Sequence, residues 1–536
     1  MRHAPWRIFA LAAAVLVITI GAVVAVVQRT EDGPVTERPG AAGQRTATPT
    51  PLTTPSPLPT GPSGEVTTIP SVRSFEDAPG PGWAPADSTR VVADPEGPLD
   101  DEADRLAEEL GAGRAPDGAR AGDVELRLSE DADTGDEGYT LRTDDQRVTI
   151  TARTDAGVFY GTRTLGQAVA DRGGTPQGTV TDRPDRPQRG LLLDIARKHF
   201  PAEWIEARLH EMAELKLNQL QLHFSDDQGF RLESETHPEI VSETHLTKEE
   251  MRGIVELAES LHITVIPEID SPGHLGAVLK AHPELQLRDA RGEPARGAVD
   301  ISDPAAAELV DDLLREYGDL FPSRYWHLGG DEYAALFSDN PEADYPDLAE
   351  AARERHGEDA GVRDLATAWL NDRADTAREL GKMPQVWNDG MHAGGVVTPD
   401  SERQVAYWTG RELGAREPVE YLEGGWQLIN LNSEYLYYVL GEPNQFTYPT
   451  GERIYEEWTP DVLRGSTPVP DEHAGADSVP GGRLAVWCDL ANAQTTEQVA
   501  QGIKLPLAAV AQKLWDPREP ELSWAEFTRL ADRVAA

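Results

Sequence analysis

Acidic, aromatic and basic side chains recur at the ends of short apolar segments in the last two thirds of the chain. The most distinctive are the adjacent acids Asp331 and Glu332, which end the segment 325–332. Taken singly, an Asp after an apolar segment more often caps a helix, and a Trp more often fills a core. Eight segments that end this way are better interpreted as one set. Its members are Asp194, Arg197, His223, Asp226, Asp270, His274, Asp331, Glu332, Trp387, Trp408, Asn432, Tyr435, Trp487 and Asp489.

These residue types together suit the binding of a carbohydrate. Sugar hydroxyls need directional hydrogen-bond acceptors, which carboxylates supply. The apolar faces of a pyranose ring stack on aromatic rings such as the indole of Trp. If the eight segments end at one place in the fold, the set predicts a sugar site that also contains ionisable groups.

The apolar pattern predicts the elements that position these residues. Eight apolar or β-branched segments alternate with amphipathic helices, of which 247–261 begins with the capping-box pair Thr247 and Glu250. Eight βα units predict a (β/α)8 TIM barrel over residues 187–536, with an irregular insertion near 440–480; a doubly wound sheet is the alternative and rarely needs so many units. The carboxyl ends of barrel strands form the active site, which would bring the set together. The segments are 190–197, 218–226, 263–270, 325–332, 384–389, 404–409, 426–433 and 483–489.

A small α+β domain is predicted to precede the barrel, over residues 88–186. It has helical patterns at 98–110 and 155–169 with β patterns between them, and no cluster of catalytic side chains. The proline-rich stretch 182–187 is expected to be the boundary between the two domains.

The first 87 residues predict a membrane segment followed by a stalk. Residues 8–27 carry no charge, are long enough to span a bilayer and follow Arg2 and Arg7. We expect residues 1–27 to be an uncleaved signal anchor that places the rest of the chain at the cell surface; a cleaved signal peptide and secretion are the alternative. Residues 28–87, rich in Pro and Thr, are expected to form a disordered stalk.

Composition narrows the possible partners. The 93 acidic and 49 basic residues give a formal charge of -44, which disfavours nucleic acid and limits membrane contact to the N-terminal segment. A single cysteine excludes disulfide frameworks and cysteine-rich zinc sites. We expect no cofactor, and no catalytic metal because His223, His274 and His327 follow different predicted strands.

The segment His327-Leu-Gly-Gly-Asp-Glu-Tyr333 resembles the signature of the family 20 glycoside hydrolases, the β-N-acetylhexosaminidases. The segments 191–197, 223–228 and 267–274 resemble other blocks of that family in the expected order. The resemblance implies substrate-assisted catalysis, in which the substrate's own 2-acetamido group is the nucleophile. It implies that Glu332 is the general acid and base, and that Asp331 orients the acetamido group and stabilises its developing positive charge.

The resemblance also implies roles for the other members of the set. Tyr435 would donate a hydrogen bond to the acetamido carbonyl oxygen, and Arg197 and Asp489 would bind ring hydroxyls. Three tryptophans would wall the acetamido pocket, and four further residues would hold the acidic pair in place. The tryptophans are Trp387, Trp408 and Trp487, and the supporting residues are His223, Asp226, Asp270 and His274.

Two positions depart from the commonest family pattern. Tyr437 stands where many members carry a hydroxyl-binding Asp, and Asp489 stands where many carry Glu. At both positions this chain resembles the subset of the family that contains dispersin-type poly-N-acetylglucosamine hydrolases, lacto-N-biosidases and surface hexosaminidases. Arg197 is retained, which favours a terminal N-acetylhexosamine. A glycosidase with a covalent carboxylate nucleophile and a non-catalytic carbohydrate-binding protein are the alternatives; the linkage, the choice of N-acetylglucosamine or N-acetylgalactosamine and exo or endo action stay open.

Overall fold

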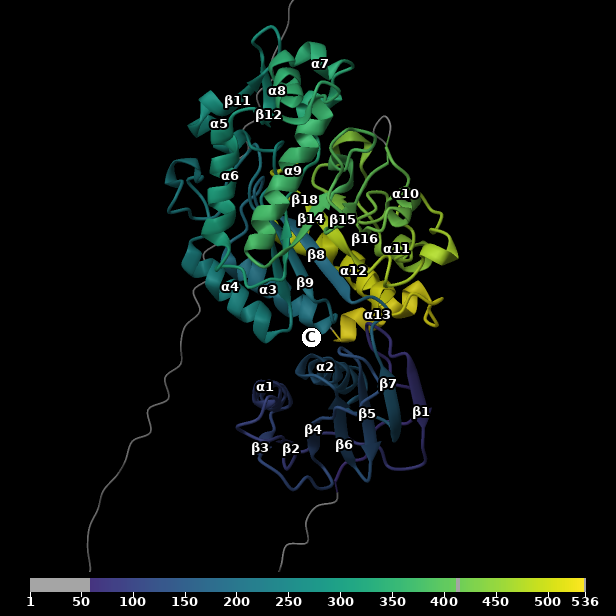
Figure 1. Ribbon diagram of the computed structural model, residues 1–536. Helices are drawn as coiled ribbons and strands as arrows, with labels where there is room; N and C mark the ends of the chain where they lie inside the picture. Colours follow the sequence, from purple (N-terminus) through teal and green to yellow (C-terminus); the bar gives the residue numbers. More distant parts are fainter. Residues whose placement is uncertain (1–57, 411–414, 535–536) are drawn as a thin grey trace, which may run out of the picture. The chain divides into compact units, whose positions relative to one another are not determined.

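The computed structural model describes residues 58–410 and 415–534, which form a small α+β domain followed by a barrel (Figure 1). The expected membrane segment at 8–27 and residues 28–57 of the expected stalk lie outside the described residues. Within the described ranges, no helix is both long and apolar enough to cross a bilayer.

The small domain is a seven-stranded mixed sheet with helix α2 packed on it, in the strand order β1-β7-β5-β6-β4-β2-β3. Helix α2 lies so close to the sheet that a Cβ at Gly161 would stand 2.5 Å from a methyl group of Ile150. The strands are β1 Ser74–Asp77, β2 Arg90–Val92, β3 Gly113–Ala115, β4 Val124–Leu128, β5 Tyr139–Asp144, β6 Arg147–Ala152 and β7 Gly178–Asp182, and the helices are α1 Asp100–Leu110 and α2 Asp155–Arg172.

The predicted start of this domain at residue 88 is wrong, because residues 58–87 belong to the folded domain. Strand β1 pairs antiparallel with β7, and Trp83 is buried with its indole N–H donating to the carbonyl oxygen of Gly122 at 3.1 Å. Ile69 is also buried. The segment is rich in Pro and Gly, a composition that is typical of a disordered stalk, and it contains few apolar residues that indicate a folded core. The predicted stalk is therefore shortened to 28–57.

The predicted TIM barrel is confirmed. The eight parallel strands run in the order β16-β15-β14-β13-β10-β9-β8-β18, and β16 pairs with β18 to close the ring. The eight strands coincide with the eight predicted segments, because each is an apolar stretch buried inside the ring of helices. They are β8 Gln188–Asp194, β9 Gln219–His223, β10 Thr264–Glu268, β13 Tyr325–His327, β14 Met383–Trp387, β15 Gln404–Tyr407, β16 Gln427–Asn430 and β18 Gly481–Trp487.

One additional strand, β17 (Tyr437–Val439), lies just before the segment predicted to be irregular. It pairs parallel with the second half of β18, with Tyr437 opposite Ala485. The first half of β18 pairs with β16 instead, so β17 widens the closing seam of the barrel at its carboxyl end. A short antiparallel pair, β11 Gln286–Arg288 and β12 Pro294–Val299, lies between α5 and α6.

Helices surround the barrel, with α3, α4 and α6 on one side of the strands and α11 and α12 on another in Figure 1. The capping box predicted at Thr247 is present at the start of α4. The helices are α3 Ala202–Glu214, α4 Lys248–Ser260, α5 Gly276–Ala281, α6 Pro304–Tyr317, α7 Pro341–Asp344, α8 Pro346–His356, α9 Val362–Glu379, α10 Pro418–Glu423, α11 Gly451–Glu457, α12 Thr496–Trp515 and α13 Trp524–Val534. The 3-10 turns are η1 Pro238–Ile240, η2 Pro283–Leu285, η3 Ala334–Phe337, η4 Asn388–Gly390, η5 Pro443–Gln445 and η6 Asp471–His473.

The inside of the barrel carries a buried polar layer beneath the strand ends. The guanidinium of Arg483 donates to side-chain oxygens of Gln221 at 2.6 Å, Gln219 at 2.9 Å and Gln385 at 3.1 Å. Burial lowers the pKa of Arg483 to about 10. The amide of Gln221 donates to Oε2 of Glu268 at 2.7 Å. The polar layer therefore holds the carboxylate of Glu268 in place inside the barrel.

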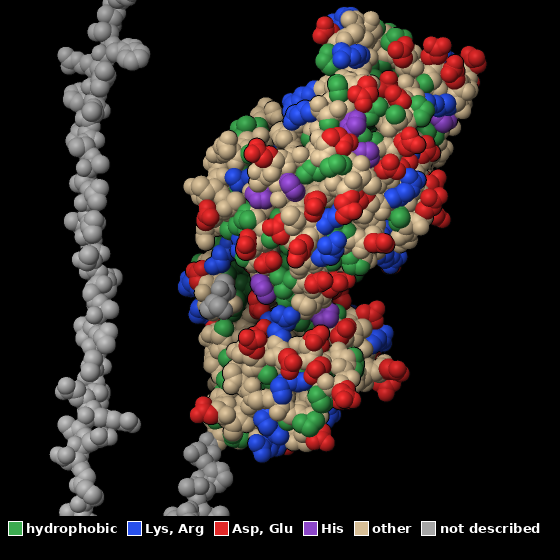
Figure 2. Space-filling view, turned by 90° about the vertical axis from the view of Figure 1, so that its left-hand side faces the viewer, with side chains coloured by type: hydrophobic (Ala, Val, Ile, Leu, Met, Phe, Trp, Pro, Cys, Tyr) green, Lys and Arg blue, Asp and Glu red, His purple; other side chains and the backbone are tan. Residues whose placement is uncertain are grey.

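Acidic side chains are spread over the face shown in Figure 2, with basic ones among them. The formal charge of -44 is thus not gathered into one patch on this face. On this face the acidic side chains disfavour the binding of a phosphate backbone.

Candidate active site

A pocket opens at the carboxyl ends of the barrel strands, where the predicted site residues were expected to meet. A larger hollow of about 400 Å³ borders α3 and α12, but it has no aromatic lining, so size alone does not identify the site. The pocket at the strand ends is lined by Arg197, His274, Asp331, Glu332, Trp387, Trp408, Tyr437, Val439, Asn444, Phe446, Trp487 and Asp489.

The backbone after β13 places the acidic pair in this pocket. Gly329 and Gly330 have φ angles of 69° and 103°, in the region that side-chain-bearing residues rarely adopt. A Cβ at Gly329 would lie 1.7 Å from a carboxylate oxygen of Asp270, so the chain must pass against that residue without a side chain. Glu332 also has a positive φ, of 48°, which is a strained conformation held by its surroundings.

Asp331 lies at the bottom of the pocket and is held in its ionised form. Its Oδ2 is 3.4 Å from Nε2 of His274. Burial alone would raise the pKa of Asp331, but His274 outweighs it and the pKa falls below the ordinary value. Asp270 shows the opposite shift, because burial and the charge of Asp331 raise its pKa well above the usual range. The pair therefore shares one negative charge, which resides on Asp331.

Glu332 lies beside Asp331 but faces the open part of the pocket. Its side chain is half exposed, and its Oε2 is 3.5 Å from Nε2 of His274. Its backbone N–H donates to Oδ2 of Asp389 at 3.1 Å, which fixes the start of the side chain. One of the two adjacent carboxylates is thus buried while its neighbour is accessible, an arrangement that lets them act on different atoms of one substrate.

Asp389 is a site residue that the sequence set did not include. It accepts hydrogen bonds from the backbone of Glu332 and, at 2.9 Å, from the indole N–H of Trp408. Burial, and then the charge of Asp331, raise its pKa to about 8. Asp389 therefore joins the acidic pair to one aromatic wall of the pocket.

A chain of ion pairs supports the acidic pair from below. Asp226 faces Nδ1 of His274 at 3.0 Å and Nε2 of His223 at 3.2 Å. His223 in turn faces Oε1 of Glu268 at 3.2 Å, and the same oxygen accepts from the indole N–H of Trp387 at 2.9 Å. Burial lowers the pKa of His274, but the neighbouring Asp331 raises it well above 6.5, so His274 is a cation.

Three of these groups also satisfy the geometry of a cation site. Single ligand atoms of Asp270, His274 and Asp331 lie within 4.8 Å of one another. The charges are already matched, however, because His274 is protonated between Asp226 and Asp331. A protonated imidazole cannot ligate a metal. We therefore interpret this group as an ion-pair network that sets the protonation of Asp331.

Arg197 lies beside His274 and is itself firmly held. It pairs with Asp194 at 2.9 Å and with Asp226 at 2.7 Å, and its guanidinium stacks 5.5 Å from the ring of Trp487. Asp489 faces the same pocket, and burial raises its pKa. A fixed guanidinium beside a carboxylate can donate to and accept from neighbouring sugar hydroxyls.

The aromatic wall is continuous. Trp387 and Trp487 pack with ring centroids 5.9 Å apart, and Tyr437 lies 5.9 Å from Trp487. Trp408 stacks on Tyr437 at 5.7 Å with the rings parallel to within 3°, and Phe446 also stacks on Tyr437, at 6.0 Å. This box suits a small apolar group such as an acetamido methyl.

The expectation for Tyr435 differs from what the structure shows. Tyr435 is buried away from the pocket, where its hydroxyl donates to Oε2 of Glu457 at 3.2 Å and its ring lies 4.0 Å from the guanidinium of Arg453. Tyr437, on β17, lines the pocket instead. Its pKa is raised well above 10, first by burial and then by the nearby charge of Asp331, so it keeps its proton and can donate it.

We expect Tyr437→Phe to lower kcat/KM on an N-acetylhexosaminide by about 10²-fold, since it removes one donor aimed into the pocket. Tyr435→Phe is the matched control and is expected to stay within a few-fold of the unmodified protein. Steady-state kinetics of the two variants test this. A larger loss for Tyr435→Phe would contradict the placement of the donor.

Residues 187–518 match the model of the glycosyl hydrolase family 20 catalytic domain, and residues 65–183 match domain 2 of that family. A lacto-N-biosidase of Bifidobacterium bifidum is 30% identical over 505 residues, which cover 92% of this chain but only 43% of that protein. A β-hexosaminidase of Akkermansia muciniphila is 31% identical over 438 residues, which cover 73% of this chain and 83% of that protein.

The fold is similar to that of a β-N-acetylhexosaminidase from Streptomyces coelicolor. That structure superimposes with a TM-score of 0.70 at 25% identity, over 87% of this chain and 94% of the other. The segment 327–333 and every pocket-lining residue lie inside the matched catalytic region.

Proposed function

Because this chain belongs to glycosyl hydrolase family 20, we propose that it hydrolyses β-linked N-acetylhexosaminides with the substrate's 2-acetamido group as the nucleophile. The observation that carries the proposal is the state of Asp331. Asp331 lines the pocket beside Glu332, and His274 holds its pKa below the ordinary value. An ionised carboxylate in the pocket suits an amide N–H that gains positive charge.

The two adjacent acids have different roles in the reaction. The N–H of the acetamido group donates to Asp331, Tyr437 donates to its carbonyl oxygen, and the aromatic box holds its methyl group. The carbonyl oxygen attacks the anomeric carbon as Glu332 donates a proton to the leaving oxygen. Glu332 then removes a proton from water, which opens the oxazolinium ring and returns the product with retained configuration.

The main competing mechanism uses an enzyme carboxylate as a covalent nucleophile. The two are separated by comparing aryl β-glycosides of N-acetylglucosamine and of glucose with the same leaving group. Substrate assistance predicts that the glucoside, which has no acetamido group, is cleaved slower by orders of magnitude. Similar rates on the two substrates would rule out substrate assistance, and no turnover of either would favour a non-catalytic binding protein.

A second candidate is the removal of a disaccharide, as by a lacto-N-biosidase, or the cleavage of poly-N-acetylglucosamine. The match to the lacto-N-biosidase favours this candidate, because it covers 92% of this chain. Tyr437 favours it too, because this pocket-lining residue stands at a position where a hydroxyl-binding Asp is common in the family. The fixed Arg197 favours a terminal N-acetylhexosamine instead. Chitobiose, poly-β-1,6-N-acetylglucosamine, lacto-N-tetraose and an aryl N-acetylglucosaminide assayed side by side separate these activities.

We also propose that the enzyme acts on glycans at the cell surface, anchored by residues 8–27. The proposal rests on the uncharged length of that segment and the basic residues before it. Fractionation and protease treatment of intact cells test it. Recovery of the protein from the medium, with a mature N-terminus after Ala25, would show secretion instead.

A further inference from the structure

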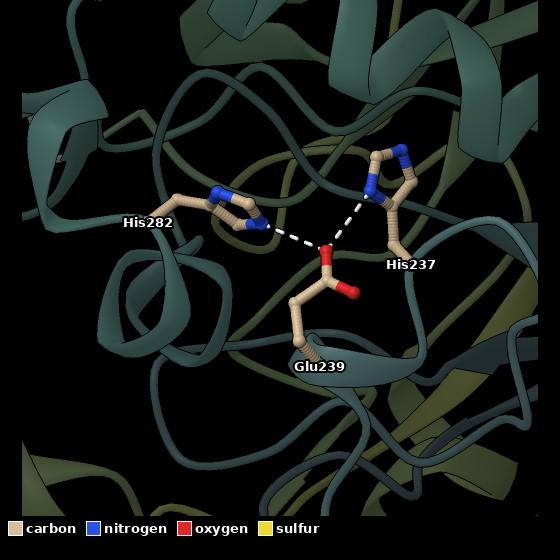
Figure 3. A group of neighbouring side chains, drawn as sticks. All are labelled: His237, Glu239 and His282. Atoms are coloured by element: carbon tan, nitrogen blue, oxygen red, sulfur yellow. Dashed lines mark hydrogen bonds and ion pairs between the residues drawn. The ribbon is translucent and has the colours of Figure 1, made fainter.

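A cluster of two histidines and a carboxylate lies outside the active site (Figure 3). Nδ1 of His237 is 3.1 Å from Oε1 of Glu239, and Nε2 of His282 is 2.9 Å from the same oxygen. In Figure 3 the two imidazole rings approach Glu239 from different segments and point their nitrogens at that oxygen. None of these residues contributes to the pocket described above.

We propose that His237, Glu239 and His282 form a binding site for a divalent transition-metal ion, with Zn²⁺ the best match. Their three ligand atoms lie within 4.8 Å of one another. Two imidazole nitrogens and one carboxylate oxygen suit Zn²⁺, whereas Mg²⁺ and Ca²⁺ prefer oxygen ligands throughout.

The distances between the ligand atoms support a small ion. Zinc bonds of about 2.0–2.1 Å in a tetrahedron place neighbouring ligand atoms about 3.3 Å apart. The two nitrogen–oxygen distances of 3.1 and 2.9 Å need to widen by only a few tenths of an ångström. Glu239 is partly exposed, so a water molecule can reach the fourth position.

The other ring nitrogens of both histidines face a further carboxylate. Nδ1 of His282 is 3.1 Å from Oε1 of Glu284, and Nε2 of His237 is 3.8 Å from Oδ2 of Asp312 on α6. Metal-binding histidines commonly make this second contact, which fixes the ring and raises its basicity.

The position of the cluster indicates a structural role for the ion. His237 and Glu239 lie at η1, after strand β9, whereas His282 precedes η2 and follows α5, after strand β10. These same two connections carry Asp226 and His274 near their starts, and those residues hold the acidic pair. An ion at the cluster would therefore link two loops whose first residues support the active site.

The test is zinc titration of the full-length protein, purified in detergent without a polyhistidine tag. We expect isothermal titration calorimetry to show one equivalent of Zn²⁺ that Glu239→Gln and His282→Gln both lose. Glu284→Gln should keep the site but bind about tenfold or more weakly, because it removes only the contact behind one ring. His210→Gln, which changes an exposed histidine on α3 outside the cluster, should bind as the unmodified protein does.

Co²⁺ and thermal unfolding provide independent readouts. Bound Co²⁺ should give the visible absorption of a tetrahedral site in the unmodified protein and not in Glu239→Gln. Added Zn²⁺ should raise the Tm of the unmodified protein and of His210→Gln but not that of Glu239→Gln, since an ion that binds the folded state stabilises it. Activity without added metal should be unchanged in Glu239→Gln, which shows that the variant is folded.

Equal zinc stoichiometry in the unmodified protein and in Glu239→Gln would overturn the proposal. So would a Tm that does not respond to zinc, because the cluster would then be only a set of ion pairs. Neither result depends on the glycosidase mechanism, so failure of the metal site and failure of the proposed function are distinguishable.

Discussion

Replacement of Glu332 by Gln is expected to lower kcat/KM on natural N-acetylhexosaminides by about 10²–10⁴-fold. The amide keeps the size of the side chain but has no proton to transfer to the leaving oxygen. Glu332 is the half-exposed member of the pair, and it lies at the open part of the pocket where the leaving group must depart. Steady-state kinetics with oligosaccharide substrates measure the loss.

Leaving-group acidity provides the control for this prediction. An aryl glycoside with an acidic phenol needs little help to depart, so the loss on that substrate should be much smaller. Azide, which needs no general base, should restore activity to the Glu332 variant and yield a glycosyl azide of retained configuration. An equal loss on both substrates would show that Glu332 does not act as the general acid.

The positions of most site residues could be predicted from the sequence because the barrel imposes a simple rule. Each strand is an apolar segment, and its carboxyl end faces the site. Trp387 and Trp487 are the last residues of β14 and β18, and both line the pocket. His223, the last residue of β9, lies beneath it in the network that contains Asp226.

The rule fails where the chain leaves the strand pattern. Tyr435 lies in a turn whose backbone hydrogen bonds run to Asn432, and β17 begins only two residues later. The side chain that enters the pocket is therefore Tyr437, and the sequence carries no signal for where that turn ends. The parallel pairing of β17 with β18 is a contact between distant segments, which a local pattern does not show.

Asp389 was missed for a different reason. It lies two residues beyond Trp387, the last residue of β14. Its role depends on two partners from elsewhere, the backbone of Glu332 and the indole of Trp408.

The start of the small domain was missed because β1 is short and mostly exposed, and its stability comes from pairing with β7 about a hundred residues later.

Replacement of Asp331 by Asn is expected to lower kcat/KM by about 10²–10³-fold on every N-acetylhexosaminide, whatever its leaving group. The amide keeps the size of the side chain but removes the negative charge that His274 maintains in the buried site. That charge is needed as the acetamido group becomes cationic, which accompanies the departure of every leaving group. An acidic phenol should therefore not rescue this variant, in contrast to Glu332→Gln.

Azide and a transition-state mimic separate this role from that of a covalent nucleophile. If Asp331 attacked the anomeric carbon, azide would replace it as the nucleophile in Asp331→Asn and give a glycosyl azide of inverted configuration; we expect none. A thiazoline analogue of the cyclised acetamido group should inhibit the unmodified enzyme strongly, because it resembles the intermediate. It should bind Asp331→Asn at least about tenfold more weakly, since the variant lacks the charge that the intermediate requires. An inverted azide product, or equal inhibition of the two proteins, would mean that the charge of Asp331 acts on the anomeric carbon rather than on the acetamido group.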